Sequence, residues 1–212
     1  MKNEVNYIND LFVQEDDVLK NIITGLDERE LPQISVSPEV GKVLYMLAKI
    51  SGATHALEIG GLGGYSTIWI GRALPETGEI LSLELKQEHV DFALENVKAA
   101  GMEDRISYLV GDAVESLDQL TTEGKKFNFF FIDADKPNYM YYLEKAIQLA
   151  MPGALIVADN LFQGGRIFDE EDDNPSPVAI RAFNEKIAVD PRLESTILTV
   201  GDGLGICRVK SV

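Results

Sequence analysis

The strongest constraint in the sequence is a repeated alternation of short apolar runs with helical patterns. Each apolar run has the length of a strand, and each segment after it has the apolar spacing of one helix face. The expected strands are His55–Ile59, Glu79–Glu84, Arg105–Val110, Phe127–Asp133 and Ala154–Ala158, and the expected helices are Tyr65–Ala73, Glu88–Ala100, Ala113–Gln119, Tyr139–Leu149 and Val178–Ala188. This alternation predicts an α/β fold in which a parallel sheet is covered by helices on both faces.

Both ends of the chain add elements to this core. The first thirty residues carry apolar side chains at helical spacing, and a further helix is expected over Pro38–Ile50, with Ser37 as its cap. Near the other end, Ser195–Val200 and Gly205–Val209 are expected to pair as a hairpin. At 212 residues with 45% hydrophobic content, the chain is expected to form one domain over residues 1–212.

The charge balance narrows the classes of partner. Lys and Arg number 19 against 35 Asp and Glu, so the net charge is −16. Such an excess argues against electrostatically driven binding to nucleic acid or to an anionic membrane, although it allows a local basic patch.

The few cysteines and histidines exclude several kinds of site. One cysteine, Cys207, excludes an internal disulfide and a Cys-x-x-Cys motif, and two histidines leave little room for a His-rich zinc site or a Ser-His-Asp triad. The start has no apolar signal-peptide core, and no apolar run approaches the roughly 20 residues that span a bilayer. We therefore expect a soluble protein of a reducing compartment, the cytoplasm.

A glycine-rich turn follows the first expected strand, at the sheet edge where ligands of such folds bind. Gly60–Gly64 contains four glycines, and the next helix begins near Ser66 with free backbone N–H groups. The turn lacks the Gly-Lys-Ser/Thr of a phosphate-binding loop, and Ser66 stands where a dinucleotide fingerprint needs its third glycine. It favours a nucleotide-type ligand over a plain tight turn.

Acids follow the next strands. Glu84 ends the second strand about twenty residues after the glycine turn, where an acid can accept both hydroxyls of a ribose. Gly111-Asp112-Ala113 follows the third strand and is either an edge for an adenine ring or an ordinary turn.

Carboxylates and an amide end the fourth and fifth strands. Asp133 and Asp135 follow the fourth, and Asp159 and Asn160 follow the fifth. If these strands are neighbours, Asp133, Asp159 and Asn160 converge as hard oxygen ligands suited to Mg²⁺, Mn²⁺ or Ca²⁺. Each pair taken alone is as readily explained as a cap of the following turn or helix.

Together these motifs resemble the cation-dependent, S-adenosylmethionine-dependent O-methyltransferases of the caffeoyl-CoA and catechol O-methyltransferase group. The resemblance covers about Ser35 to Lys210. Its markers are Glu58-Ile59-Gly60, Gly64-Tyr65-Ser66, Ile132-Asp133-Ala134-Asp135-Lys136, Asp159-Asn160, Ile180-Arg181-Ala182-Phe183-Asn184 and Val200-Gly201-Asp202-Gly203-Leu204. It implies a doubly wound, Rossmann-like methyltransferase fold. That fold has a mostly parallel seven-stranded sheet, an antiparallel C-terminal hairpin strand, and extra helices in residues 1–50 that border the site.

The resemblance also implies roles for individual residues. The S-adenosylmethionine contacts would be Val36, Glu58, Gly60, Gly61, Ser66, Glu84, Asp112, Ala113 and Asp133. Asp133, Asp159 and Asn160 would bind the cation, most simply Mg²⁺, and Lys136 matches the family's general base, with Asp133 beside it. Without that motif, Lys136 would be an ordinary surface ion pair with Asp135. A homodimer is implied as well.

The reaction expected is methyl transfer from S-adenosylmethionine to a small vicinal-dihydroxy aromatic. A phenol is a poor nucleophile at neutral pH, and a divalent cation or a lysine with a lowered pKa would favour its phenolate. The chain departs from the plant enzymes, because Ala158 replaces an aromatic residue and the segment Leu161–Arg166 lacks a tryptophan. The acceptor class of the plant enzymes therefore does not transfer directly, and the acidic segment of residues 169–173 is expected to be a solvated loop.

Three alternatives stay open at this point. The first is a methyltransferase acting on 5-hydroxyuridine in tRNA, with a basic rim from Lys136, Arg166, Arg181 and Lys186, although the net charge disfavours it. The second is a nucleotide-binding regulatory domain without catalysis. The third is an NAD-dependent oxidoreductase, which the missing third glycine weakens.

Overall fold

The computed structural model describes residues 3–210. Its helices are α1 (Glu4–Phe12), α2 (Asp17–Glu28), α3 (Pro38–Ile50), α4 (Tyr65–Ala73), α5 (Gln87–Ala99), α6 (Ala113–Thr122), α7 (Tyr139–Leu149) and α8 (Pro175–Val189). Its strands are β1 (His55–Ile59), β2 (Glu79–Glu84), β3 (Ile106–Val110), β4 (Phe127–Ile132), β5 (Ala150–Ala158), β6 (Leu193–Leu198) and β7 (Leu204–Val209). Short 3₁₀ turns follow β4 and β5, at Lys136–Asn138 and Gln163–Phe168.

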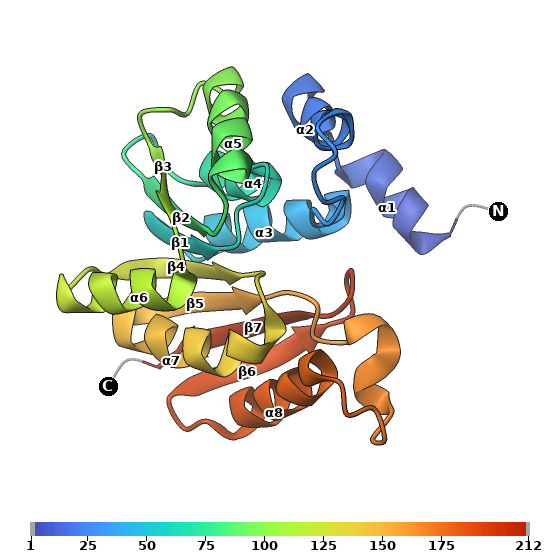
Figure 1. The fold of residues 1–212 in the computed structure, drawn as a ribbon, viewed down its shortest axis with the longest axis vertical. Helices are drawn as coiled ribbons and strands as arrows, with labels where there is room; N and C mark the ends of the chain where they lie inside the picture. Colours follow the sequence, from blue (N-terminus) through green and yellow to red (C-terminus); the bar gives the residue numbers. More distant parts are fainter. Residues whose placement is uncertain (1–2, 211–212) are drawn as a thin grey trace.

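The strands form a seven-stranded sheet in the order β3-β2-β1-β4-β5-β7-β6 (Figure 1). The strands from β3 to β5 pair in parallel, whereas β7 runs antiparallel to both β5 and β6. The expected α/β fold with an antiparallel C-terminal hairpin is confirmed. Strand order reverses between β1 and β4, and the crevice beyond the carboxyl ends of such strands is where doubly wound sheets bind ligands.

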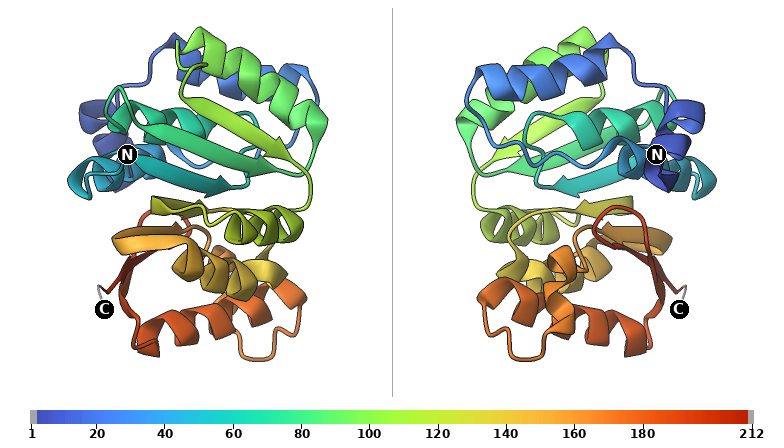
Figure 2. Two further views of the ribbon diagram at one scale, coloured as in Figure 1. Left: turned by 90° about the vertical axis from the view of Figure 1, so that its left-hand side faces the viewer. Right: turned by 90° about the vertical axis from the view of Figure 1, so that its right-hand side faces the viewer.

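Helices cover both faces of the sheet (Figure 2). Successive side chains of a strand point to opposite faces, so apolar strands need cover on both. On one face, Phe129 and Phe131 belong to a buried cluster that includes apolar residues of α2, α3, α4 and α5. On the other face, Phe130 and Ile132 belong to a cluster with α6, α7 and α8. Strands apolar on both faces are thus explained by burial from both sides.

Tertiary contacts shift several element boundaries. The expected helical N-terminal region is two helices, because the carboxylate of Asp16 caps a new start by accepting from the N–H of Leu19. Ser37 is the N-cap residue of α3 as expected, but its hydroxyl donates to Glu39 instead of accepting from the helix backbone. The expected turn at Pro152-Gly153 lies inside β5, which begins at Ala150 and pairs with Phe127 across a register shift.

The helices between residues 3 and 210 include none that is both long enough and apolar enough to cross a membrane.

Candidate active site

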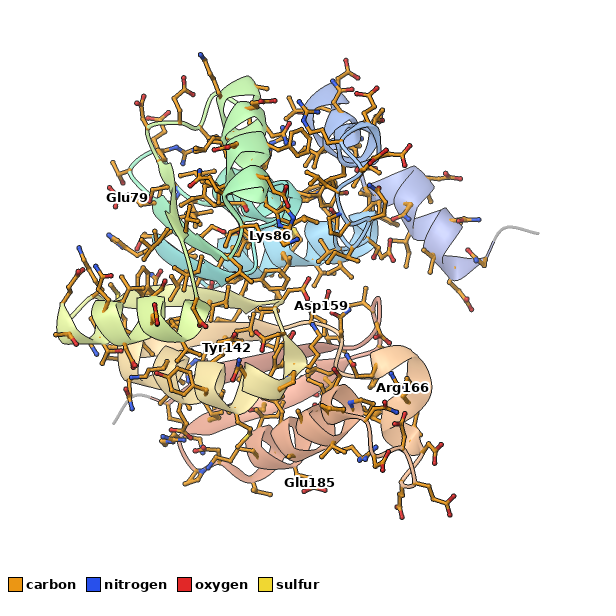
Figure 3. The ribbon with its side chains drawn as sticks, in the orientation of Figure 1. Glu79, Lys86, Tyr142, Asp159, Arg166 and Glu185 are labelled. Atoms are coloured by element: carbon orange, nitrogen blue, oxygen red, sulfur yellow. The ribbon has the colours of Figure 1, made fainter. Side chains whose placement is uncertain are left out.

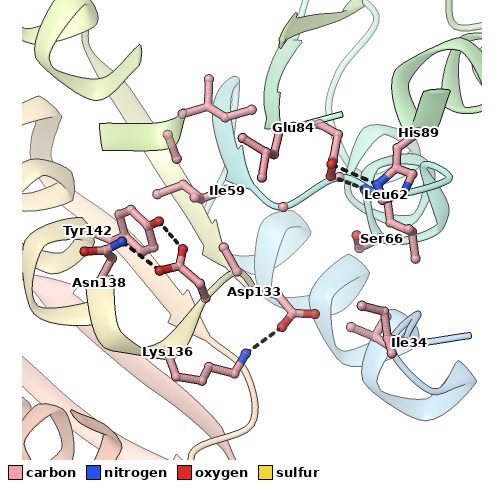
Figure 4. A pocket seen from close by; sticks show the side chains of 18 of the residues that line it. Ile34, Ile59, Leu62, Ser66, Glu84, His89, Asp133, Lys136, Asn138 and Tyr142 are labelled. Atoms are coloured by element: carbon pink, nitrogen blue, oxygen red, sulfur yellow. Dashed lines mark hydrogen bonds and ion pairs between the residues drawn. The ribbon is translucent and has the colours of Figure 1, made fainter. Parts of the chain in front are cut away.

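A cavity of about 830 Å³ opens at the carboxyl ends of β1, β2, β3 and β4 (Figure 4). Its volume is in the range of small-molecule sites. Most of the residues expected to bind a ligand line this cavity: Val36, Gly60, Gly61, Ser66, Glu84, Asp112, Ala113, Asp133, Lys136 and Asn160. Two others lie outside the lining: Glu58 is fully buried and Asp159 is 4% exposed.

The glycine turn lets two strand ends approach closely. A Cβ on Gly60 would lie 2.1 Å from the backbone oxygen of Asp133, and the φ of Gly60 is +96°. A Cβ on Gly61 would lie 2.4 Å from the hydroxyl of Ser82. Side chains are therefore excluded here, and backbone lines the cavity where β1 passes into α4.

Glu58 supports this turn from inside the protein. Its carboxylate accepts hydrogen bonds from the hydroxyls of Ser66 at 2.6 Å, Thr67 at 2.5 Å and Ser82 at 2.6 Å. Burial raises the pKa of Glu58, and these hydroxyl donors oppose that rise. The sequence motif places Glu58 at the right strand end, but its observed contacts are within the protein.

Glu84 is held rigidly at the far side of the cavity. One carboxylate oxygen accepts from the N–H of Leu62 at 2.9 Å, which ties Glu84 to the glycine turn. The other oxygen is 2.9 Å from Nδ1 of His89 and 3.1 Å from the N–H of Lys86. Glu84 and His89 are both buried and both line the cavity (Figure 4). An acid oriented in this way can receive two vicinal hydroxyls.

Asp112 has a local structural contact. Its carboxylate accepts from the N–H of Val114 at 2.7 Å and so caps α6, which begins at Ala113. Both residues lie on the cavity lining. The helix start gives this end of the cavity free backbone N–H groups.

Lys136 forms its ion pair with Asp133. From the sequence alone, Asp135 was the alternative partner. Nζ of Lys136 lies 3.0 Å from Oδ1 of Asp133 and 2.8 Å from the hydroxyl of Tyr139. Asp135 instead accepts from Tyr142 and from Asn138. The Lys136 side chain is only 14% exposed, so this is a partly buried pair at the cavity wall and not a surface pair.

Asp159 and Asn160 follow β5, beside Asp133. Figure 3 shows Asp159 near the centre of the molecule. Burial, reinforced by the carboxylate of Asp133, raises the pKa of Asp159 to about 7. Two crowded carboxylates favour a bound cation, and Asn160 on the lining adds an amide group, so the donor set fits a hard divalent ion. Within residues 3–210, no group of three or more His, Cys, Asp or Glu is placed to hold a metal ion.

The basic residues considered for a nucleic-acid rim all have partners. Arg166 pairs with Asp172 at 2.8 Å, Arg181 donates to the carbonyl oxygens of Asp169 and Asp172, Lys186 pairs with Asp190 at 3.1 Å, and Lys136 pairs with Asp133. The acidic loop of residues 169–173 is accordingly held in place at Asp172. Its other members are exposed: Asp169, Glu170, Glu171 and Asp173.

Sequence reasoning missed His89, Tyr139 and Ser82. The position of His89, five residues after Glu84 on the next helix, was a usable signal, because a strand end and the first turn of the following helix lie close together. Tyr139 and Ser82 reach the site through helix packing and strand register, which the sequence does not reveal.

Comparison with known proteins adds three findings. The model of the O-methyltransferase family matches residues 9–210. The chain is 41% identical to a catechol O-methyltransferase of Niastella koreensis, over 97% of this chain and 96% of that protein. It is 39% identical to a catechol O-methyltransferase of Mycobacterium tuberculosis, over 96% of this chain and 94% of that one.

Solved structures agree with these relatives. An O-methyltransferase from Bacillus cereus in complex with S-adenosylhomocysteine superimposes with a TM-score of 0.91 at 40% identity, covering 96% of each chain. The O-methyltransferase TomG from Streptomyces achromogenes, in complex with S-adenosylmethionine, superimposes with a TM-score of 0.90 at 33% identity, covering 97% of this chain and 95% of that one.

Proposed function

This chain belongs to the O-methyltransferase family and is an S-adenosylmethionine-dependent enzyme of the catechol and caffeoyl-CoA type, and we propose that it methylates one hydroxyl of a small vicinal-dihydroxy aromatic with the help of a divalent cation. One observation carries the proposal: Asp133, Lys136 and Asn160 meet on the wall of the cavity that also holds the glycine turn and Glu84. The residues that we propose as base and as cation ligands therefore share one cavity with the proposed cofactor site.

We assign the cofactor contacts to the glycine side of the cavity. Gly60 and Gly61 offer backbone without side chains, and Ser66 lies in the first turn of α4, on the cavity lining. Glu84 would accept the ribose hydroxyls, with Asp112 and Ala113 at the adenine end. Val36 would cover the methionine part, and the buried Glu58 would support the turn.

We assign the acceptor side to Asp133, Lys136, Asp159 and Asn160. Asp133, Asp159 and Asn160 would hold a divalent cation, which would supply positive charge that favours the ionised form of the acceptor hydroxyl. Lys136 would take the hydroxyl proton, and the walls of the cavity would hold the acceptor oxygen in line with the methyl group. Mg²⁺ is the simplest choice of cation for such oxygen ligands.

A small acceptor is favoured over tRNA. The rim cations that tRNA binding would need are already engaged by carboxylates and carbonyl oxygens, and the net charge is −16. An exposed apolar side chain, Ile34 at 71%, borders the cavity and offers a surface for an aromatic ring.

A methyl-transfer assay with radiolabelled cofactor tests the acceptor. We expect label in catechol or in a hydroxycinnamoyl thioester and none in tRNA that lacks this modification. Label in tRNA alone would replace our proposal with the tRNA reaction.

The cation is tested by removal. EDTA is expected to abolish transfer and Mg²⁺ to restore it, and Asp159→Asn is expected to lower transfer by at least about tenfold because a charged ligand becomes a neutral amide. The exposed Asp104→Asn serves as the matched control. Full activity of the enzyme in EDTA would refute the proposal that transfer needs a divalent cation.

We also propose a homodimer that works in the cytoplasm. On α1 no residue is buried, and Tyr7, Leu11 and Phe12 are 57%, 54% and 61% exposed, which supports contact with a second copy. Light scattering is expected to give about twice the chain mass of 23.4 kDa. A single-chain mass at working concentration would refute the dimer.

A further inference from the structure

The hydroxyl of Tyr139 joins three parts of the proposed acceptor site. The ring is fully buried and packs edge-on against Phe183 at a centroid distance of 5.3 Å. The hydroxyl oxygen lies 2.8 Å from Nζ of Lys136, 3.0 Å from the carbonyl oxygen of Asp159 and 3.3 Å from that of Ile132. No other tyrosine hydroxyl between residues 3 and 210 contacts Lys136.

The number of protons decides which way these hydrogen bonds run. A tyrosine hydroxyl has one proton, and a carbonyl oxygen can only accept. The Tyr139 proton therefore points to the carbonyl of Asp159, the nearer of the two. The hydroxyl oxygen must then act as an acceptor towards Lys136.

Two hydrogen bonds also fix the orientation of the Lys136 nitrogen. One N–H points to Oδ1 of Asp133 at 3.0 Å and a second to Tyr139 at 2.8 Å. A tetrahedral nitrogen has one position left, and Lys136 lies on the cavity lining. Two of the three positions that Nζ has beyond its bond to carbon are thus occupied, and the third is left for the acceptor hydroxyl.

We propose that Tyr139 is a positioning residue, which holds Nζ of Lys136 so that the unoccupied position of this nitrogen faces the acceptor hydroxyl. The inference rests on the proposed function of Lys136 as base. In the step concerned, the acceptor O–H bond breaks, its proton forms the third N–H bond of Lys136, and the electron pair stays on the acceptor oxygen that receives the methyl group.

A purely structural role for Tyr139 would have a different signature. The hydroxyl also ties the ends of β4 and β5 together, so its loss could displace Asp159. Such a displacement would slow every acceptor, whereas loss of the base position slows only acceptors that arrive protonated.

The test compares Tyr139→Phe with the wild-type enzyme on two acceptors, catechol and 4-nitrocatechol, whose nitro group makes a hydroxyl acidic enough to ionise near neutral pH. With catechol we expect kcat to fall by about tenfold or more, with KM for S-adenosylmethionine within about twofold. With 4-nitrocatechol, which needs no base, we expect kcat within about threefold of wild type.

Tyr141→Phe is the matched control, since this tyrosine lies on the same helix and donates to Asp118 at 2.5 Å, away from the cavity. It is expected to leave kcat unchanged. The affinity for S-adenosylhomocysteine, measured by calorimetry, is expected to stay within about twofold in both variants and shows that each is folded.

Other outcomes overturn the inference. Equal losses on both acceptors would assign Tyr139 a structural role. An unchanged kcat on catechol would show that the Tyr139 hydroxyl has no role in the reaction. Absence of transfer to either acceptor by the wild-type enzyme would instead refute the proposed function itself, and this inference with it.

Discussion

Gly60 lies where β1 and β4 end too close together for a side chain. Gly60→Ala is expected to destabilise the protein by about 3 kcal/mol or more, because strain at φ +96° adds to a clash with the Asp133 backbone. Urea denaturation measures this loss. Binding of S-adenosylhomocysteine is expected to weaken as well, because the glycine turn must move.

Gly124→Ala is the matched control for that variant. Gly124 also has a positive φ, +68°, but a Cβ there would meet no atom within 4 Å. Only backbone strain of about 1 kcal/mol is expected, with ligand binding unchanged. If both variants lost the same stability, the close approach at Gly60 would not matter.

His89 orients Glu84, and its removal should weaken cofactor binding. Its Nδ1 lies 2.9 Å from one carboxylate oxygen of Glu84. We expect His89→Leu to raise the dissociation constant of S-adenosylhomocysteine by about tenfold, the cost of one charged hydrogen bond. His89→Asn keeps a donor near the Nδ1 position and should recover most of that affinity.

His55→Leu controls for the loss of a histidine, because His55 contacts the neighbouring Thr54 at the other end of β1. It should leave the dissociation constant unchanged. Equal affinity of His89→Leu and wild type would show that Glu84 holds its position without help.

At the scale of elements, the sequence predicts well whatever depends on local pattern. Apolar runs and helical spacing locate the parallel strands to within a few residues, because burial on both faces demands continuous apolar strands. The start of β5 was missed, because pairing with Phe127 across a bulge overrides the turn preference of Pro152-Gly153. The N-terminal break at Asp16 was missed because only its cap distinguishes it.

The candidate site follows the same division. Strand-end residues such as Asp133 and Asn160 could be grouped in advance, since parallel strands share one edge. The bond between Glu58 and Ser82 could not, because it requires the β1–β2 register in which these two residues lie opposite each other. Tyr139 depends on how α7 packs, which no local pattern encodes.

The end of α8 carries a pH-dependent part of the stability. Asp190 accepts from Arg192 and Lys186, and the Arg192 guanidinium holds the pKa of Asp190 well below its ordinary value. A lowered folded pKa contributes stability above the unfolded pKa of about 4, which is lost as the pH falls through the folded value. Asp190→Asn should therefore cost on the order of 2 kcal/mol at pH 7 and progressively less below about pH 4.

Urea denaturation at several pH values checks that prediction. The control is Glu194→Gln, which breaks the exposed pair with Arg208 at 3.2 Å and should cost less than about 0.5 kcal/mol at any pH. A pH-independent deficit in Asp190→Asn would mean that the contribution comes from packing and not from ionisation.

At the scale of the whole molecule, the cavity joins parts of the chain that are distant in sequence. Its lining runs from Ile34, before α3, to Asn160, after β5, and includes the ends of β1, β2 and β4. A ligand there contacts elements from both buried clusters that sandwich the sheet. Ligand binding should therefore stabilise the molecule as one cooperative unit.

The stabilisation that each ligand gives can distinguish a methyltransferase from a dinucleotide-dependent enzyme. S-adenosylhomocysteine at about 100 times its dissociation constant should add about 2.7 kcal/mol, which raises Tm by roughly 5–10 °C for a chain of this size. NAD at the same concentration should shift Tm by less than about 1 °C, because the turn lacks the third glycine of a dinucleotide site. Glu84→Gln should reduce the S-adenosylhomocysteine shift at that concentration, since the ribose loses a charged acceptor. An equal shift with NAD, or a full shift in Glu84→Gln, would contradict this assignment of the cavity.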